Sequence, residues 1–221
     1  MKVTHNDIKK AIVKSQHCQR NWDLTKVIPD DDLNLLIQAA TECPSKQNLA
    51  HYKVHFITNR DTIEAIHSNT EGFARNYTDE EISYETNSQT LANLLVVFEA
   101  YDFRQKLYTD PVIRNDETQK ILTNQTLSTV DKEVLKRDQQ IAVGIAAGYL
   151  NLLSSILGYS TGCCSCFSPE PIQKILNADN EILLLMGIGF NNSDKNRRIH
   201  QKTGFVFPTK KKQKIEVSIL K

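Results

Sequence analysis

A long stretch without any charged side chain, from Ile141 to Tyr159, places the strongest constraint on how this chain folds. It is almost long enough to cross a bilayer as a helix, which takes about 20 apolar residues. Asn151, Ser154 and Ser155 interrupt the stretch, together with several Ala and Gly residues, so its hydrophobicity is modest. The stretch therefore predicts a buried helix of a globular core rather than a membrane span.

This stretch belongs to the longest predicted helix, Asp131 to Leu157. Gly144 and Gly148 would let another helix approach it closely. Larger apolar side chains recur along it at helical intervals, namely at Leu135, Ile141, Ile145, Tyr149, Leu152 and Ile156.

Shorter elements alternate along the rest of the chain, without the strict rhythm of a parallel α/β fold. Helices are predicted behind a capping box formed by Thr4 and Asp7, after Pro29 with its three following acids, and from Ser168-Pro169. Strands are predicted at Tyr52 to Thr58, Leu94 to Phe98, Ser160 to Cys163, Ile182 to Ile188 and Lys214 to Leu220. We expect one domain over residues 1–221 with an α+β fold, in which helices surround a mixed or mostly antiparallel sheet.

Composition limits the classes of function. The chain has 221 residues, 40% of them hydrophobic and 24% charged, which is typical of one globular domain. A net charge of +1 gives no electrostatic reason to expect nucleic acid or a membrane as a partner. The run Lys210-Lys211-Lys212 is interpreted as a solvated stretch. Because Lys9 and Lys10 interrupt any early apolar segment, we expect no signal peptide, a cytoplasmic location and free thiols.

Two familiar motifs are incomplete. Gly187-Ile188-Gly189 follows a predicted strand, but no third glycine and no capped helix follow, so a dinucleotide fingerprint is rejected. The cluster Cys163-Cys164-Ser165-Cys166 lacks the CxxC spacing of structural zinc sites and has no second pair elsewhere. A redox role for these thiols stays open, but small buried residues in a tight loop are the favoured interpretation, and no metal is expected.

Three segments carry a more specific signal by their order. They are Gln16 to Asp23, Cys43 to Asn48, and the end of the long helix with the following Ser160 to Phe167. In this order they resemble the FMN-binding nitroreductase family. That family typically shows an RxSxR-x-F/Y motif, then a PSxxN motif, then a glycine-ended helix leading to a flavin-contacting loop. The resemblance runs over most of the chain and is weakest from Arg60 to Ser88 and from Tyr101 to Val130.

The resemblance assigns flavin contacts to the first segment, with two departures. Arg20 matches the cation near the pyrimidine edge of the flavin, where two-electron reduction places negative charge. Gln16 stands where the family has a phosphate-binding Arg, and Cys18 where it has a phosphate-binding Ser. An amide brings no charge and a thiol is a poor donor. His17 belongs to the same contact segment.

The later matches complete the implied cofactor site. Ser165 and Cys166 match positions whose backbone amides approach flavin N5, and Cys164 precedes them in the same loop. Lys195 and Arg197 match the cations that hold the FMN phosphate. The resemblance thus implies FMN as the cofactor, with NADH or NADPH as a transient electron donor.

A homodimer is implied as well. Pro44, Ser45 and Asn48 match the second motif, which in this family contacts FMN from the partner subunit. The long central helix is the expected contact between subunits. The predicted strand from Lys214 to Leu220 would extend to the partner's sheet, as family members often do.

The implied activity is reduction of electron-poor acceptors, such as nitroaromatics or quinones, by ping-pong hydride transfer through flavin N5. This chemistry needs no dedicated general base, so no catalytic side chain is predicted. Tyr101, Phe103 and Tyr108 are candidates for the cover of the pocket. Two alternatives remain: a specialised flavoenzyme with a single substrate, and a flavin-binding scaffold without turnover, which the departures at Gln16 and Cys18 suggest.

Overall fold

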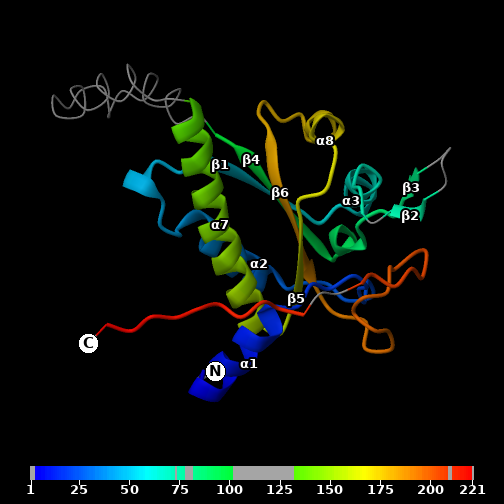
Figure 1. Ribbon diagram of the computed structural model, residues 1–221, viewed down its shortest axis with the longest axis horizontal. Coiled ribbons are helices and arrows are strands. Elements are labelled where there is room, and N and C mark those ends of the chain that lie inside the picture. The colour runs from blue at the N-terminus through cyan, green and yellow to red at the C-terminus, as the bar shows by residue number, and fades with distance from the viewer. Residues whose placement is uncertain (1–2, 73, 78–81, 102–131, 209–210, 221) are drawn as a thin grey trace.

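A four-stranded antiparallel sheet forms the centre of the computed structural model, which describes residues 3–72, 74–77, 82–101, 132–208 and 211–220 (Figure 1). Its strands lie in the order β1-β4-β6-β5. They are β1 (Tyr52–Ile57), β4 (Leu94–Ala100), β6 (Ile182–Gly189) and β5 (Ser160–Cys164). Every predicted strand before residue 190 is therefore present, and the prediction of an α+β fold is confirmed.

Two helices cover one face of this sheet. They are α2 (Asp30–Thr41) and the long helix α7 (Lys132–Ile156), which crosses in front of the strands in Figure 1. The apolar core between helices and sheet includes Leu36, Ala40, Val96, Phe98, Ala146, Leu150, Met186 and Ile188. Burial of these side chains is the main force that fixes the helices on the sheet.

The opposite face of the sheet carries two shorter helices, α3 (Arg60–His67) and α8 (Pro169–Leu176). Their buried residues Ile63, Ile66 and Ile172 pack against Val97 and Leu185 from the central strands. The remaining described elements are α1 (His5–Ser15), the 3₁₀ turns η1 (Lys46–Asn48) and η2 (Ser88–Leu91), and a small hairpin of β2 (Ala74–Tyr77) and β3 (Ile82–Tyr84).

Helix α7 has two different faces. Small side chains such as Ala142, Ala146 and Ala147 point into the core, whereas the large residues Ile141 and Tyr149 are 54% and 51% exposed. The expectation that α7 is simply a buried core helix is thus only half right. Of its periodic large apolar residues, Ile141, Tyr149 and Leu152 form a stripe on the outer side, where Gly144 and Gly148 meet no atom within 4 Å of an added Cβ.

The C-terminal segment differs from its predicted state. Residues 214–220 form no strand within this chain, and Ile215, Val217 and Ile219 are all more than 70% exposed. Figure 1 shows the segment running past the end of α7, away from the sheet. In a single chain it lacks a strand to pair with. No helix in the described part of the chain combines the length and the apolarity needed to cross a membrane.

Candidate functional site

The segment after α1 lies directly against the edge strand β5. Cys18 forms a parallel bridge with Thr161, and the Gln19 amide donates a hydrogen bond of 2.8 Å to the Thr161 carbonyl oxygen. Gly162 permits this approach, because a Cβ there would lie 2.7 Å from the Gln19 carbonyl oxygen and 3.2 Å from the Cys18 sulfur. Two of the three predicted segments therefore meet, although about 140 residues separate them along the chain.

The loop after β6 joins them. The backbone N–H of Arg20 donates to the Arg197 carbonyl oxygen at 3.0 Å, and Arg197 Nη1 donates to the Cys18 carbonyl oxygen at 3.2 Å. The side chain of Asn21 donates to the carbonyl oxygens of Asn196 at 2.6 Å and Ile199 at 3.2 Å. These reciprocal bonds hold Arg197 of the loop beside Arg20 of the N-terminal segment.

A hollow of about 590 Å³ opens where these segments meet. Among the described residues, its lining contains the cations Arg20, Arg197 and Lys212 and no carboxylate. The other lining residues are Ser15, Gln16, His17, Cys18 and Asn151. A concave site with several cations and hydrogen-bonding groups but no acid suits a phosphorylated ligand. Of the predicted cations, Lys195 does not line this hollow.

Asn151 and Lys212 were not anticipated from the sequence. The Asn151 amide donates to the Ser15 carbonyl oxygen at 3.0 Å and accepts from the Thr161 hydroxyl at 2.6 Å, so it locks α1 onto β5. Lys212 lies in the lysine run that we interpreted as solvated; the residue is exposed, and it also lines the hollow. No local sequence signal distinguishes Lys212 from its neighbours, because only the path of the C-terminal segment brings it to the hollow.

The loop after β5 borders a second hollow of about 420 Å³. Ser165 and Phe167 line it from the loop, and Val143 and Gly144 line it from α7. Within the loop, the sulfur of the buried Cys164 donates a hydrogen bond to the Cys166 carbonyl oxygen at 3.5 Å. Ser165 is thus presented to an open space between the loop and the long helix.

Two thiols of this region, Cys164 and Cys18, have pKa values above the usual range of a thiol. Burial raises the pKa of the Cys164 thiol to about 12. Burial also raises the pKa of Cys18, and the nearby charges of Arg20 and Arg197 offset this effect only in part. Because the thiolate is the reactive form, these thiols are poor nucleophiles at neutral pH. Among the described residues, no group of three His, Cys, Asp or Glu is arranged to hold a metal ion.

The second predicted motif lies at the other end of α7. Lys46, inside that motif, donates to Asp138 Oδ2 at 2.6 Å. The hollow instead contacts Asn151, 13 residues further along the helix, which corresponds to about 20 Å at 1.5 Å per residue. Pro44, Ser45 and Asn48 therefore do not share the hollow with Arg20 in one chain. Tyr101 is half-buried, whereas Phe103 and Tyr108 lie outside the described residues.

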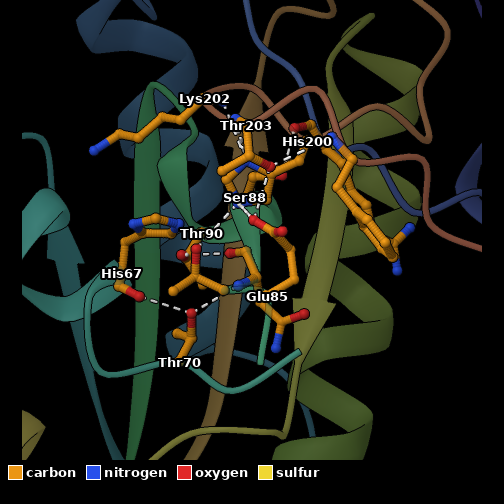
Figure 2. Close-up of polar contacts among 12 residues, drawn as sticks. His67, Thr70, Glu85, Ser88, Thr90, His200, Lys202 and Thr203 are labelled. Atoms are coloured by element: carbon orange, nitrogen blue, oxygen red, sulfur yellow. Dashed lines mark hydrogen bonds and ion pairs between the residues drawn. The ribbon is translucent and has the colours of Figure 1, made fainter. Parts of the chain in front are cut away.

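A buried polar cluster anchors the loop that carries Arg197 (Figure 2). His200 Nδ1 accepts the backbone N–H groups of Lys202 at 3.1 Å and Thr203 at 3.2 Å, so this nitrogen carries no proton. Its Nε2 lies 3.1 Å from the Thr86 hydroxyl and 3.7 Å from Glu85 Oε1. Glu85 Oε1 also accepts from the Thr203 hydroxyl at 2.7 Å. The cluster fixes the turn after His200 against the body of the protein.

Solved structures share this fold. A protein from Bacillus subtilis assigned as a nitroreductase superimposes with a TM-score of 0.69 at 16% identity, covering 93% of this chain and 96% of its own. A protein from Staphylococcus epidermidis assigned as an NAD(P)H:FMN oxidoreductase gives a TM-score of 0.66 at 20% identity, covering 89% and 92%. A protein from Exiguobacterium sibiricum assigned as a nitroreductase, in complex with FMN, gives 0.64 at 16% identity, covering 89% and 92%.

Comparison with curated protein sequences finds no match. The model of the nitroreductase family, however, matches residues 13–190. This range includes the segment after α1, the long helix and the loop after β5, which together carry the resemblance seen in the sequence. The match spans most of the chain, and the family predicted from the sequence is confirmed. The chain belongs to the nitroreductase family.

Proposed function

We propose that this protein is an FMN-dependent oxidoreductase that uses NAD(P)H to reduce electron-poor acceptors, such as nitroaromatics or quinones. The observation that carries the proposal is the acid-free hollow lined by Arg20, Arg197 and Lys212. It is formed by the segments that match the family's flavin-binding motifs. The Exiguobacterium sibiricum neighbour with this fold is in complex with FMN.

The residues of the hollow fit this cofactor by their chemistry. Arg197 and Lys212 would hold the phosphate, with the Cys18 thiol and the Gln16 amide as weaker donors. Lys212 makes up for the charge that Gln16 lacks. Arg20 would lie at the pyrimidine edge of the isoalloxazine ring, and the backbone of Ser165 and Cys166 beside N5. When bound, FMN supplies the hydride-accepting and hydride-donating chemistry, so the chain's own residues bind, orient and polarise it.

A homodimer completes the proposed site. The outer stripe of α7 exposes Ile141, Tyr149 and Leu152, and α1 exposes Ile12 and Val13 nearby. Large contiguous apolar surfaces of this kind mark interfaces. The second motif faces away from the hollow of its own chain, so it is placed to contribute Pro44, Ser45 and Asn48 to the site of a second copy. The exposed segment 214–220 is the proposed strand for the partner's sheet.

A specialised reductase is the second candidate. One structural neighbour, with a TM-score of 0.65 and 18% identity, is an enone reductase of gut-bacterial fatty acid saturation, so this fold also serves reduction of an activated C=C bond. In both candidates the flavin hollow is the same, and only the acceptor differs. A steady-state comparison of a nitroaromatic, a quinone and an enone as acceptors separates them.

The decisive test is the visible spectrum of the purified protein before and after addition of FMN, followed by NADH or NADPH oxidation with menadione as acceptor. We expect a flavin spectrum and turnover. A colourless protein that takes up no FMN contradicts the proposal, and a flavin-loaded protein without turnover would instead be a binding scaffold. The cytoplasmic location stays a prediction.

The dimer is tested separately by sedimentation of Ile141→Glu. We expect this variant to be monomeric and to bind FMN weakly, because the second motif no longer reaches the site. Ile175→Glu is the matched control, since Ile175 is a partly exposed isoleucine of α8 on the other side of the sheet. A flavin-loaded wild-type monomer at working concentration would overturn the dimer.

A further inference from the structure

The guanidinium of Arg20 packs on an aromatic ring rather than against an acid. Its Cζ lies 4.4 Å from the centroid of the Phe207 ring. Its Nε is buried and has no hydrogen-bond partner, and in the described part of the chain no carboxylate forms an ion pair with it. The position of this cation in the hollow is therefore set by packing over Phe207.

Phe207 is itself held firmly. The ring is completely buried. It is stacked with the His200 ring at 6.0 Å and 25°, and Phe205 meets it edge-on at 5.1 Å. The Phe207 N–H donates to the Arg198 carbonyl oxygen at 3.0 Å, which fixes the backbone below the ring. His200 is itself held by the polar cluster of Figure 2, so the ring stacked with Phe207 is fixed in place.

An aromatic face and a carboxylate hold a cation with different consequences. The ring attracts the guanidinium through its quadrupole and leaves the net positive charge intact. A carboxylate at the same place would cancel most of that charge. Arg20 is thus both fixed and electrostatically uncompensated within the described residues. A fixed, uncompensated cation favours a bound group that gains negative charge at the same edge.

We propose that Phe207 is a positioning residue that holds Arg20 at the flavin edge and thereby raises the reduction potential of bound FMN. The inference rests on the proposed function, and it adds a residue beyond the end of the matched family region at 190. Phe207 makes no contact with the acceptor in this scheme. It acts through Arg20, so its effect is on how strongly the protein prefers reduced over oxidised FMN.

The first test replaces Phe207 by Leu and measures the midpoint potential of bound FMN together with FMN affinity. Without the ring, Arg20 relaxes toward solvent, and the ratio of affinities for reduced and oxidised FMN falls about tenfold. That change corresponds to a potential about 30 mV lower for a two-electron couple. Phe56→Leu is the control, because Phe56 lies on β1 at the other edge of the sheet from β5 and no described cation lies over its ring, and we expect its potential to match the wild type. Phe207→Tyr should restore the wild-type potential.

A second test keeps the protein folded by preserving the shape of the ring. Phenylalanines with one, two and three fluorine atoms are introduced at position 207, which weakens the negative face of the ring stepwise. We expect the flavin potential to fall in the same order at unchanged thermal stability. If the wild type binds FMN but the fluorinated variants show no such trend in potential, the role of Phe207 is refuted and the proposed function is not. A wild-type chain that binds no FMN refutes the proposed function as well.

Discussion

Arg197 Nη1 donates a hydrogen bond of 3.2 Å to the carbonyl oxygen of Cys18, which ties the loop after β6 to the segment after α1. The bond uses one of the five N–H donors of the guanidinium and leaves the others for a ligand. The two residues are 179 positions apart in the sequence. The hollow can therefore form only after the C-terminal loop has packed. Ligand affinity consequently depends on the packing of this loop.

Replacement of Lys212 tests whether this residue binds the phosphate. We expect Lys212→Ala to weaken FMN binding about tenfold, the value of one charge-assisted contact of roughly 1.5 kcal/mol. Riboflavin has no phosphate, so its affinity should be unchanged. Fluorescence titration of the apoprotein with both flavins measures the two values. Lys211→Ala removes the adjacent lysine, which does not line the hollow, and serves as the control. Equal losses for FMN and riboflavin would argue against a phosphate contact.

Cys18→Ser should tighten FMN binding. A hydroxyl donates a stronger hydrogen bond than a thiol, and the smaller oxygen fits in the space that the sulfur occupies. We expect a gain of about threefold to tenfold, or roughly 0.5–1.5 kcal/mol. Calorimetric titration of the apoprotein measures it. Cys18→Ala, which has no donor at this position, is the control and should show no gain. Weaker binding by Cys18→Ser would show that the thiol makes an apolar contact instead.

The sequence predicted the secondary structure well because its signals are local. The capping box of Thr4 and Asp7, the acids after Pro29 and the uncharged stretch of α7 each determine the conformation of their own residues. The outward direction of the stripe at Ile141 was missed, because helical periodicity identifies a face but not what covers it. Which surface a residue meets depends on tertiary packing, so no local pattern carries that information.

The same distinction holds for the site. Arg20, Cys18 and Arg197 were predicted from motif order, and the structure brings them to one hollow. Lys212 and Phe207 come from the C-terminal loop, whose path is set by the buried contacts of His200 with elements far away in sequence. Lys195 was predicted from the same family resemblance as Arg197, but it lies outside the lining. The resemblance alone therefore could not select which cations face the hollow.

Gly187 lies within the buried part of β6 and belongs to the motif that was rejected as a dinucleotide fingerprint. An added Cβ would lie 2.0 Å from the Gln89 carbonyl oxygen and 2.9 Å from the Ala92 Cβ, so η2 could not pack against the sheet. We expect Gly187→Ala to destabilise the protein by about 3 kcal/mol, measured by urea unfolding. Met186→Leu, a volume-conserving change at the neighbouring buried position, should cost less than about 1.5 kcal/mol. If Gly187→Ala left the free energy of unfolding unchanged, the close approach of η2 would be contradicted.

His67 should make the stability of the protein fall on acidification. The residue is 4% exposed, both ring nitrogens lack hydrogen-bond partners, and its ring lies 5.7 Å from that of His200 (Figure 2). Burial, together with the nearby His200 and Lys202, lowers its pKa from 6.5 to about 4. Between these values the unfolded chain binds a proton that the folded chain does not. Stability is therefore fully present above pH 6.5 and is lost as the pH falls toward 4.

The expected loss from this one group is about 1–3 kcal/mol between about pH 7 and about pH 4.5. Urea unfolding at both pH values measures it. His67→Leu removes the titration and two unsatisfied buried nitrogens, so we expect a flatter pH dependence and stability at pH 7 that is equal or higher by about 1 kcal/mol. His5→Gln, at an exposed position of α1, should leave the slope as in the wild type. If His67→Leu keeps the full slope, the loss on acidification arises from other groups, and His67 is not the residue that senses it.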